Sequence, residues 1–258
     1  MTILKKLFDF YIQSSIHVGI AVCCLVKITN FSLPPAHIQG NSVMVFLGTV
    51  LGYNFLKYYK VFSKENFHTF KYYGIFAISF LSGFGFLFYL WLLKSIQIPM
   101  LISGIFVVVY PFLRKHGWLK LFFVSFVVSY ITVYIPFFLH KSILLDYYIT
   151  LVQRFFILSS LMIPFEIMDT KTDDQTMNTL PQLLGIQKAK LLGYVFIVVF
   201  LLLEFINFSI HNFLINAIIA IVTVVFIRFT SLERDEYYTS FWVESVPIFW
   251  WILILIFR

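Results

Sequence analysis

The sequence predicts an all-α integral membrane protein, a bundle of nine transmembrane helices with the N-terminus inside and the C-terminus outside. Three observations predict this class: the composition, the length of the apolar runs and the placement of lysine and arginine. Of the 258 residues, 60% are hydrophobic and 12% are charged, with a mean hydropathy of +0.91. Soluble domains carry about 25% charged residues and cannot hide so many apolar side chains. The composition therefore excludes a soluble enzyme, a coiled coil and a disordered chain.

Nine apolar runs approach or reach the roughly 20 residues that a helix needs to cross the hydrocarbon layer. The runs are continuous and lack the period of two that membrane barrel strands show, so they indicate helices. We predict spans over 10–28, 42–62, 72–93, 98–113, 118–139, 143–164, 190–208, 210–230 and 237–257. Pro136, Pro164 and Pro247 are expected to kink or end helices. Residues 1–258 form one membrane domain, whose longest polar stretch is the inside loop at 165–189.

Lysine and arginine predict the orientation of the bundle. With the N-terminus inside, four basic residues fall outside, Arg154 lies within a span, and the other 14 of 19 fall inside. The inside set is Lys5, Lys6, Lys57, Lys60, Lys64, Lys71, Arg114, Lys115, Lys120, Lys171, Lys188, Lys190, Arg228 and Arg234. Such a bias is typical of membrane topology. It explains the net charge of +7 without a nucleic-acid partner. A composition rich in Phe, Ile, Lys and Tyr is typical of AT-rich bacterial genomes, so we expect a multi-pass protein of a bacterial cytoplasmic membrane.

Acidic residues are concentrated in the loop after the sixth predicted span, in the segment PFEIMDTKTDDQTMNTLPQLLG. Glu166, Asp169 and Asp173 have the spacing i, i+3, i+7, so on a helix they share one face. Stacked carboxylates repel one another unless a cation lies between them, and Mg²⁺ favours such ligands at a site that also holds phosphates. The alternative is a solvated acidic loop that Lys171 and nearby basic residues neutralise.

This segment resembles the second aspartate-rich motif of the UbiA-type membrane prenyltransferases. That motif has carboxylates in the pattern D-x-x-D-x-x-x-D followed by a T-L-P…L-G stretch, and Thr179 to Pro181 with Gly185 match its tail. The resemblance implies a nine-helix fold that transfers a prenyl group from a prenyl diphosphate to a lipophilic acceptor, such as an aromatic compound or a quinone precursor. It also implies Mg²⁺ as the cofactor, with Asp169 and Asp173 as catalytic metal ligands and Glu166 as a further ligand.

The family's first motif, N-D-x-x-D-x-x-x-D, is lost at the inner end of the second span. Asn54 matches its asparagine, but Phe55, Tyr58 and Phe62 occupy its three aspartate positions. Half of the expected metal coordination is therefore missing. The loss favours the alternative of a catalytically inactive homologue that binds a lipid or a partner protein. A third reading, a small transporter, lacks the inverted repeat typical of that class.

Lysines replace the missing carboxylates at this place. Lys57, Lys60 and Lys64 repeat the spacing i, i+3, i+7. Three interpretations remain open: these lysines pair directly with the carboxylates, they bind the diphosphate together with Asn54, or they are ordinary inside lysines that reach lipid phosphates. We take Asn54, Lys57 and Lys60 as candidate diphosphate-binding residues.

Two further ionisable residues lie within predicted spans. Arg154 is near the middle of the sixth span and Glu244 is one to two turns inside the ninth. A charge at that depth costs roughly 2.5–3.5 kcal/mol on insertion scales unless it is paired or hydrated. We predict that Arg154, Glu244 and Tyr134 line a cavity, with the alternative that the two charges pair with each other or that they cap backbone carbonyls.

Overall fold

In the computed structural model, the described residues 3–33, 40–62, 70–114, 116–140, 144–206 and 209–257 contain helices as their only regular elements. Seven helices are long and apolar enough to cross a membrane. The bent pair α1 (Ile3–Gln13) and α2 (Ile16–Ser32) makes an eighth if it is one span. The predicted class, an all-helical integral membrane bundle, is therefore confirmed, whereas nine spans and the orientation stay predictions.

Every predicted range contains a helix. The remaining elements are α3 (Asn41–Phe62), α4 (Phe70–Leu92), η1 (Lys94–Ile96), α5 (Gln97–Leu113), α6 (Gly117–Ser129), η2 (Tyr130–Tyr134), α7 (Ile135–His140), α8 (Leu144–Asp169), η3 (Gln175–Met177), α9 (Leu180–Leu184), α10 (Ile186–Glu204), α11 (Ile210–Phe229), η4 (Tyr238–Val243) and α12 (Val246–Ile256). Helix α3 is not among the seven candidate spans, because polar Asn54, Lys57 and Lys60 lower the hydropathy of its second half.

The structure corrects two predicted boundaries. The first predicted span, 10–28, crosses a 54° bend between α1 and α2, where Ser15 adopts a left-handed conformation with φ of 60°. The sixth predicted span ends at Pro164, but α8 continues to Asp169. Neighbouring helices and local adjustments tolerate proline in membrane helices. The extension keeps Glu166 and Asp169 on a continuous helix.

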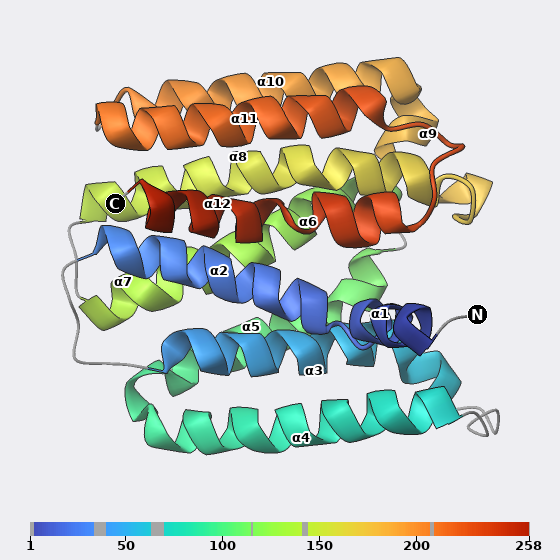
Figure 1. The fold of residues 1–258 in the computed structure, drawn as a ribbon, viewed down its shortest axis with the longest axis vertical. Helices are drawn as coiled ribbons and strands as arrows, with labels where there is room; N and C mark the ends of the chain where they lie inside the picture. Colours follow the sequence, from blue (N-terminus) through green and yellow to red (C-terminus); the bar gives the residue numbers. More distant parts are fainter. Residues whose placement is uncertain are drawn as a thin grey trace.

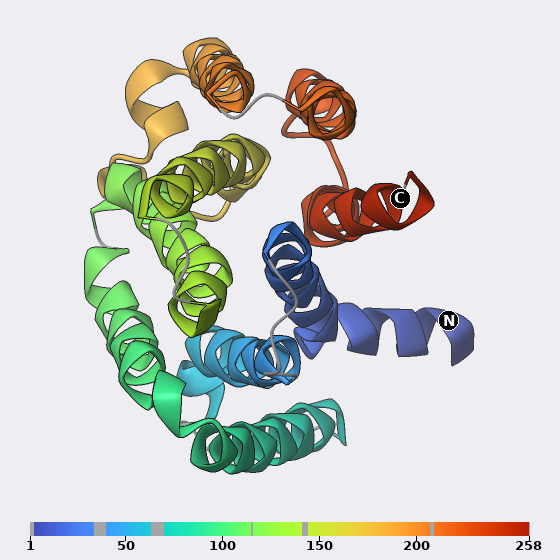
Figure 2. The same ribbon diagram turned by 90° about the vertical axis from the view of Figure 1, so that its left-hand side faces the viewer.

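Helix α8 is the central element of the bundle. It packs against α6, α10 and α11, and 61% of its most apolar window is buried, compared with 17% for α4. The face of α4 that stays exposed carries large apolar side chains such as Phe80, Phe84 and Trp91. Such a face is suited to lipid as its solvent. Figure 2 shows α8 within the bundle and α4 at its edge.

The helices run back and forth between two ends of the bundle (Figure 1). We call one of them the charged end: α3, α5, α8 and α11 finish there, and α4, α6 and α10 begin there. Many basic residues of the predicted inside set belong to these helix ends and their connections: Lys57, Lys71, Arg114, Lys120, Lys171, Lys188, Lys190, Arg228 and Arg234. The structure thus gathers at one end the residues whose loops the sequence predicts to be inside.

Helix α1 projects from the side of the bundle near the charged end (Figures 1 and 2). It exposes Ile3, Leu4 and Leu7. The Tyr237 hydroxyl donates a hydrogen bond to Asp9, which fastens α1 to the connection between α11 and η4 and raises the pKa of Tyr237 to about 12. An exposed apolar stripe beside Lys5 and Lys6 is typical of a helix that lies in the membrane interface.

Candidate functional site

The three carboxylates of the acidic segment converge on one lysine of α6. Lys120 Nζ lies 2.5 Å from Asp169 Oδ2, 3.3 Å from Glu166 Oε1 and 3.7 Å from Asp173 Oδ2. Arg114 adds a longer contact, with Nη2 3.8 Å from Asp173 Oδ1. We call Lys120, Glu166, Asp169 and Asp173 the carboxylate cluster. The three acids therefore lie together around a protein ammonium group, although Asp173 follows the end of α8 and is not on the helix face that the spacing predicts.

The backbone around the cluster explains the convergence. After α8, the amides of Thr172 and Asp173 both donate to Asp169 O, at 2.9 and 2.8 Å, so the chain turns back beside the helix end. On the facing helix, a Cβ atom at Gly117 would lie 2.3 Å from Met177 O, so only glycine lets α6 start against this loop. Lys120 follows Gly117 by one turn. The close approach therefore directs Lys120 into the carboxylates.

The cluster is not electrically balanced. Three carboxylates face one ammonium. The Arg114 guanidinium adds little compensation, because its side chain is 48% exposed and its contact with Asp173 is 3.8 Å long. Neither oxygen of Glu166 accepts a hydrogen bond from the described residues, nor does Asp173 Oδ2, although all three atoms are buried. Native proteins rarely leave buried acceptors unmatched. These oxygens therefore have capacity for a further donor or cation.

Polar side chains from α3, α5 and η4 extend the charged surroundings of the cluster. Tyr53 lies within electrostatic range of Asp169, Tyr110, Arg114 and Glu244. Lys57 lies within range of Glu244. Tyr53 and Lys57 are exposed, so they can contact a ligand. Tyr53 and Arg114 therefore place a hydroxyl and a cationic donor near the carboxylate cluster, whereas Lys57 lies near Glu244.

The predicted asparagine ligand, Asn54, serves the fold instead. Its side chain is fully buried, and its amide donates to Ser14 O and Ser79 Oγ, at 3.0 Å each. Its oxygen accepts from Ser15 Oγ at 2.7 Å. The amide thus holds the α1–α2 bend against α3 and α4, with no donor left for a diphosphate.

Of the predicted lysine face of α3, the structure describes only the side chain of Lys57, and Lys57 does not form an ion pair with the carboxylates. Within the described residues, Lys120 of α6 and Arg114 are the cations that contact them, and Lys57 belongs to the surroundings of Glu244. Direct ion pairs with the carboxylates are therefore present, formed by Lys120 and Arg114, and Lys57 is not one of the partners. The side chain of Lys60 and the whole of Lys64 lie outside the described residues.

Magnesium does not fit the cluster in this arrangement. The carboxylate donors suit the ion, but the Lys120 ammonium lies where a shared cation would be. Across the described ranges, no group of three His, Cys, Asp or Glu side chains is placed to hold a metal. We therefore derive no chemical step through Mg²⁺, and the predicted cofactor becomes a question for experiment.

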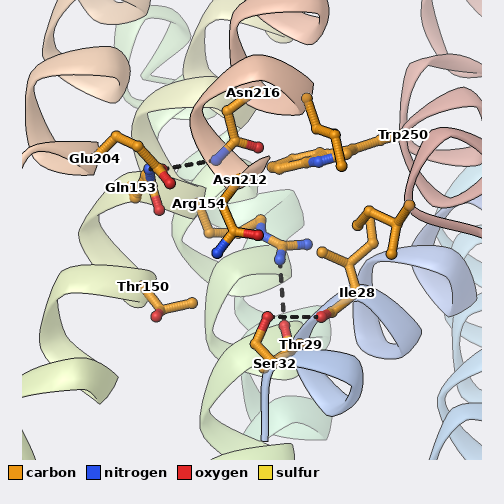
Figure 3. A pocket seen from close by; sticks show the side chains of 12 residues that line it. Ile28, Thr29, Ser32, Thr150, Gln153, Arg154, Glu204, Asn212, Asn216 and Trp250 are labelled. Atoms are coloured by element: carbon orange, nitrogen blue, oxygen red, sulfur yellow. Dashed lines mark hydrogen bonds between the residues drawn. The ribbon is translucent and has the colours of Figure 1, made fainter. Parts of the chain in front are cut away.

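The predicted intramembrane residues do not form one cavity. Arg154 is 3% exposed and lines a cavity of about 110 Å³ in the opposite half of the bundle (Figure 3). Its guanidinium donates to Leu25 O, which matches the alternative of a capped carbonyl. Glu244 follows the π-helical turn η4, and Tyr134 stacks on Tyr130 with ring centroids 4.8 Å apart. Neither residue lines the Arg154 cavity.

Sequence reasoning missed two groups of residues. The sequence groups Lys120 only with the inside lysines, yet it falls within the predicted span 118–139, and that position is the signal that could have singled it out. The second group surrounds Arg154: Glu204 accepts from Gln153 Nε2 and Asn216 Nδ2, at 2.6 and 2.7 Å. These polar residues lie on three different helices, which no local pattern connects.

The Asp174 carboxyl next to the cluster is exposed and points elsewhere. Its Oδ1 accepts from the backbone N–H of Thr176 at 3.1 Å, and this hydrogen bond lowers the pKa of Asp174 below its ordinary value. Asp174 therefore offers a natural control for charge changes in the same loop.

Comparisons with known proteins add no family to this picture. No family model, no curated protein and no solved structure matches the chain.

Proposed function

We propose that this protein is a UbiA-like membrane prenyltransferase, which transfers a prenyl group from a prenyl diphosphate to a lipophilic acceptor of the aromatic or quinone-precursor class. The observation that carries the proposal is the convergence of Glu166, Asp169 and Asp173 at the charged end. Their segment resembles the second prenyltransferase motif, which implies that the three carboxylates take part in binding the prenyl diphosphate.

The surroundings of the cluster support binding of a diphosphate. Arg114 and Lys57 are exposed cations, and the Tyr53 hydroxyl lies within range of both Asp169 and Arg114. Cationic side chains bind phosphate oxygens through charge-assisted hydrogen bonds. The lipid-facing apolar surface of the bundle would accept the prenyl chain, because both are apolar.

The proposed reaction breaks the allylic C–O bond, and diphosphate leaves with the electron pair. The acceptor forms a bond to the allylic carbon and loses a proton. Donors aimed at the leaving group stabilise the charge that develops on it. In this chain those donors would be the exposed cations Arg114 and Lys57.

A prenyl-transfer assay tests this function. Purified protein is incubated with labelled prenyl diphosphates of several chain lengths, with and without Mg²⁺, and a membrane lipid extract supplies the acceptor. We expect diphosphate release that Asp169→Asn abolishes and that the matched Asp174→Asn change leaves intact. A requirement for Mg²⁺ would support the cofactor that the resemblance implies. No release at any chain length would contradict prenyl transfer.

The second candidate is an inactive homologue that binds a lipid or a partner protein. The position of Lys120 favours it, because an ammonium within 4 Å of three carboxylates leaves little demand for a metal. Binding of a non-cleavable prenyl diphosphate analogue separates the two candidates. Saturable binding without release would support the binding protein, and release would support the enzyme.

The location follows from the same proposal. Several long apolar helices support a multi-pass membrane protein, and we place it in a bacterial cytoplasmic membrane with the charged end inside. The positive-inside rule supports this orientation, because most basic residues belong to the charged end.

A further inference from the structure

The cavity around Arg154 lies far from the carboxylate cluster. Both sites use α8, but Arg154 precedes Asp169 by 15 residues, which is about 22 Å along a helix that rises 1.5 Å per residue. Its lining includes Ser32 at the end of α2, Thr150 near the start of α8 and Asn212 near the start of α11. These helix ends all belong to the bundle end opposite the charged end. The cavity is therefore a separate site near the other membrane surface.

Arg154 brings a positive charge to this cavity without a carboxylate partner. Its guanidinium donates to Leu25 O and Thr29 Oγ1, at 3.2 Å each, and lies 5.1 Å from the centre of the Trp250 ring. No carboxylate of the described residues lies within 4.0 Å of it. A guanidinium has five N–H donors, so three of them remain for a ligand.

Glu204 brings a negative charge to another wall of the same cavity. Figure 3 shows its carboxylate beside Gln153 and Asn216, while the guanidinium of Arg154 points toward Thr29. Both amide donors bind Oε2, so Oε1 is left for a ligand. Amides are neutral, so the charge of Glu204 is solvated by dipoles but not cancelled.

A cavity that holds an unpaired cation and an unpaired anion on different walls matches a ligand with both charges. Its volume of about 110 Å³ well exceeds the roughly 10–15 Å³ that one water needs. Its place at the helix ends corresponds to the depth of lipid headgroups. We infer that this cavity binds the zwitterionic phosphoethanolamine group, with its phosphate on Arg154 and its ammonium on Glu204. The same chemistry can come from a phospholipid headgroup or from the free zwitterion.

Native mass spectrometry of the delipidated full chain tests this inference. The protein is titrated with phosphatidylethanolamine, phosphatidylcholine and phosphatidylglycerol of identical acyl chains. The choline group has no N–H donor, and the glycerol group has no positive charge. We expect phosphatidylethanolamine to bind at least about tenfold more tightly than either, because each of the others lacks one charge-assisted hydrogen bond. Equal binding of the three lipids would overturn the inference.

Two variants assign the two charges. Glu204→Gln should remove the preference for phosphatidylethanolamine over phosphatidylglycerol, and Arg154→Gln should weaken both. Arg234→Gln, an equal charge change on an exposed residue, should change neither. Because Arg154→Gln can fail to fold, the Glu204→Gln result decides, and an unchanged preference there would overturn the inference.

Competition with free O-phosphoethanolamine identifies the source. Displacement of the bound lipid by the free compound assigns the cavity to a soluble zwitterion. Retention of the lipid, together with the preference above, assigns it to the phospholipid. Neither result depends on prenyl transfer at the charged end.

Discussion

Lys120 of α6 donates a hydrogen bond to Asp169 of α8, with Nζ 2.5 Å from Oδ2. The same ammonium lies 3.3 Å from Glu166, whose side chain is completely buried. This contact joins the two helices at the charged end and supplies a cation at the place where the resemblance to prenyltransferases implies a metal. The stability of the bundle and the chemistry of the site therefore both depend on Lys120.

Lys120→Met should destabilise the bundle strongly. The change removes the cation and leaves three carboxylates, one of them fully buried, without compensation. Removing one partner of a buried ion pair costs about 3–5 kcal/mol. We expect a clearly lower Tm in detergent than for Lys171→Met, a matched change at an exposed lysine. A second change, Glu166→Gln, should restore part of the loss, and equal Tm values for the two lysine variants would contradict this account.

Asn54→Leu should lower the stability of the bundle and leave the binding of a diphosphate analogue unchanged. Leucine has a similar size, but Ser14 O, Ser15 Oγ and Ser79 Oγ each lose a hydrogen-bond partner. A buried group left unmatched costs about 1–3 kcal/mol. The neighbouring change Tyr53→Phe affects an exposed hydroxyl and should leave the Tm unchanged. Weaker binding of a diphosphate analogue by Asn54→Leu at an unchanged Tm would instead make Asn54 a ligand residue.

Much of the architecture could be predicted from the sequence because lipid imposes simple rules. Long apolar runs become helices, so all nine predicted ranges contain helices. Basic residues gather at one end of the bundle, as the predicted orientation requires. The break at Ser15 could not be predicted, because it depends on a hydrogen bond to Asn54, 39 residues away. The continuation of α8 through Pro164 likewise depends on packing against neighbouring helices and not on local propensity.

The candidate site also has one part that the sequence could predict and another part that depends on tertiary packing. The spacing of Glu166 and Asp169 is a local signal that places both on one face of α8, whereas Asp173 joins them through the turn that follows the helix. Their partner Lys120 is 46 residues before the first of them, and Gly117 brings it there through a contact with a distant loop. Pairings of this kind are fixed by tertiary packing. The resemblance directs attention to α3 instead, because the first aspartate motif of that family lies at the inner end of the second span.

Asp9→Asn should loosen the attachment of α1. The Tyr237 hydroxyl donates to Asp9, and an amide oxygen is a weaker acceptor than a carboxylate. We expect faster hydrogen exchange over 3–13 than in the wild type, with the exchange of α8 unchanged. Asp146→Asn, a change of an acidic residue at the start of α8, serves as the control. Unchanged exchange in α1 would show that its apolar contacts alone hold it.

Cysteine labelling should place the charged end inside the cell. In a background with Cys23→Ser and Cys24→Ser, a single cysteine replaces exposed Thr172 in one variant and exposed Ser95 in another. The positive-inside rule puts Thr172 in the cytoplasm and Ser95 outside. A membrane-impermeant maleimide should therefore label Ser95→Cys in intact cells and Thr172→Cys only after permeabilisation. The reverse pattern would invert the predicted orientation, and labelling of both in intact cells would contradict an odd number of passes between these positions.

Gly117→Ala should disturb the carboxylate cluster although residue 117 has no charge. A Cβ atom there would meet backbone atoms of Met177, Asn178 and Thr179 within 2.3–2.9 Å, so α6 or the loop must move. Overpacking of this kind costs typically about 1–3 kcal/mol, and the shift should also separate Lys120 from Asp169. Gly104→Ala is the matched control, because a Cβ atom there has no neighbour within 4 Å in the described structure. We expect Gly117→Ala to lower the Tm of the wild type. It should lower the Tm of the Lys120→Met variant much less, because that variant has already lost the contact between residue 120 and the carboxylates. Full additivity of the two changes would show that the close approach of α6 and the placement of Lys120 are independent.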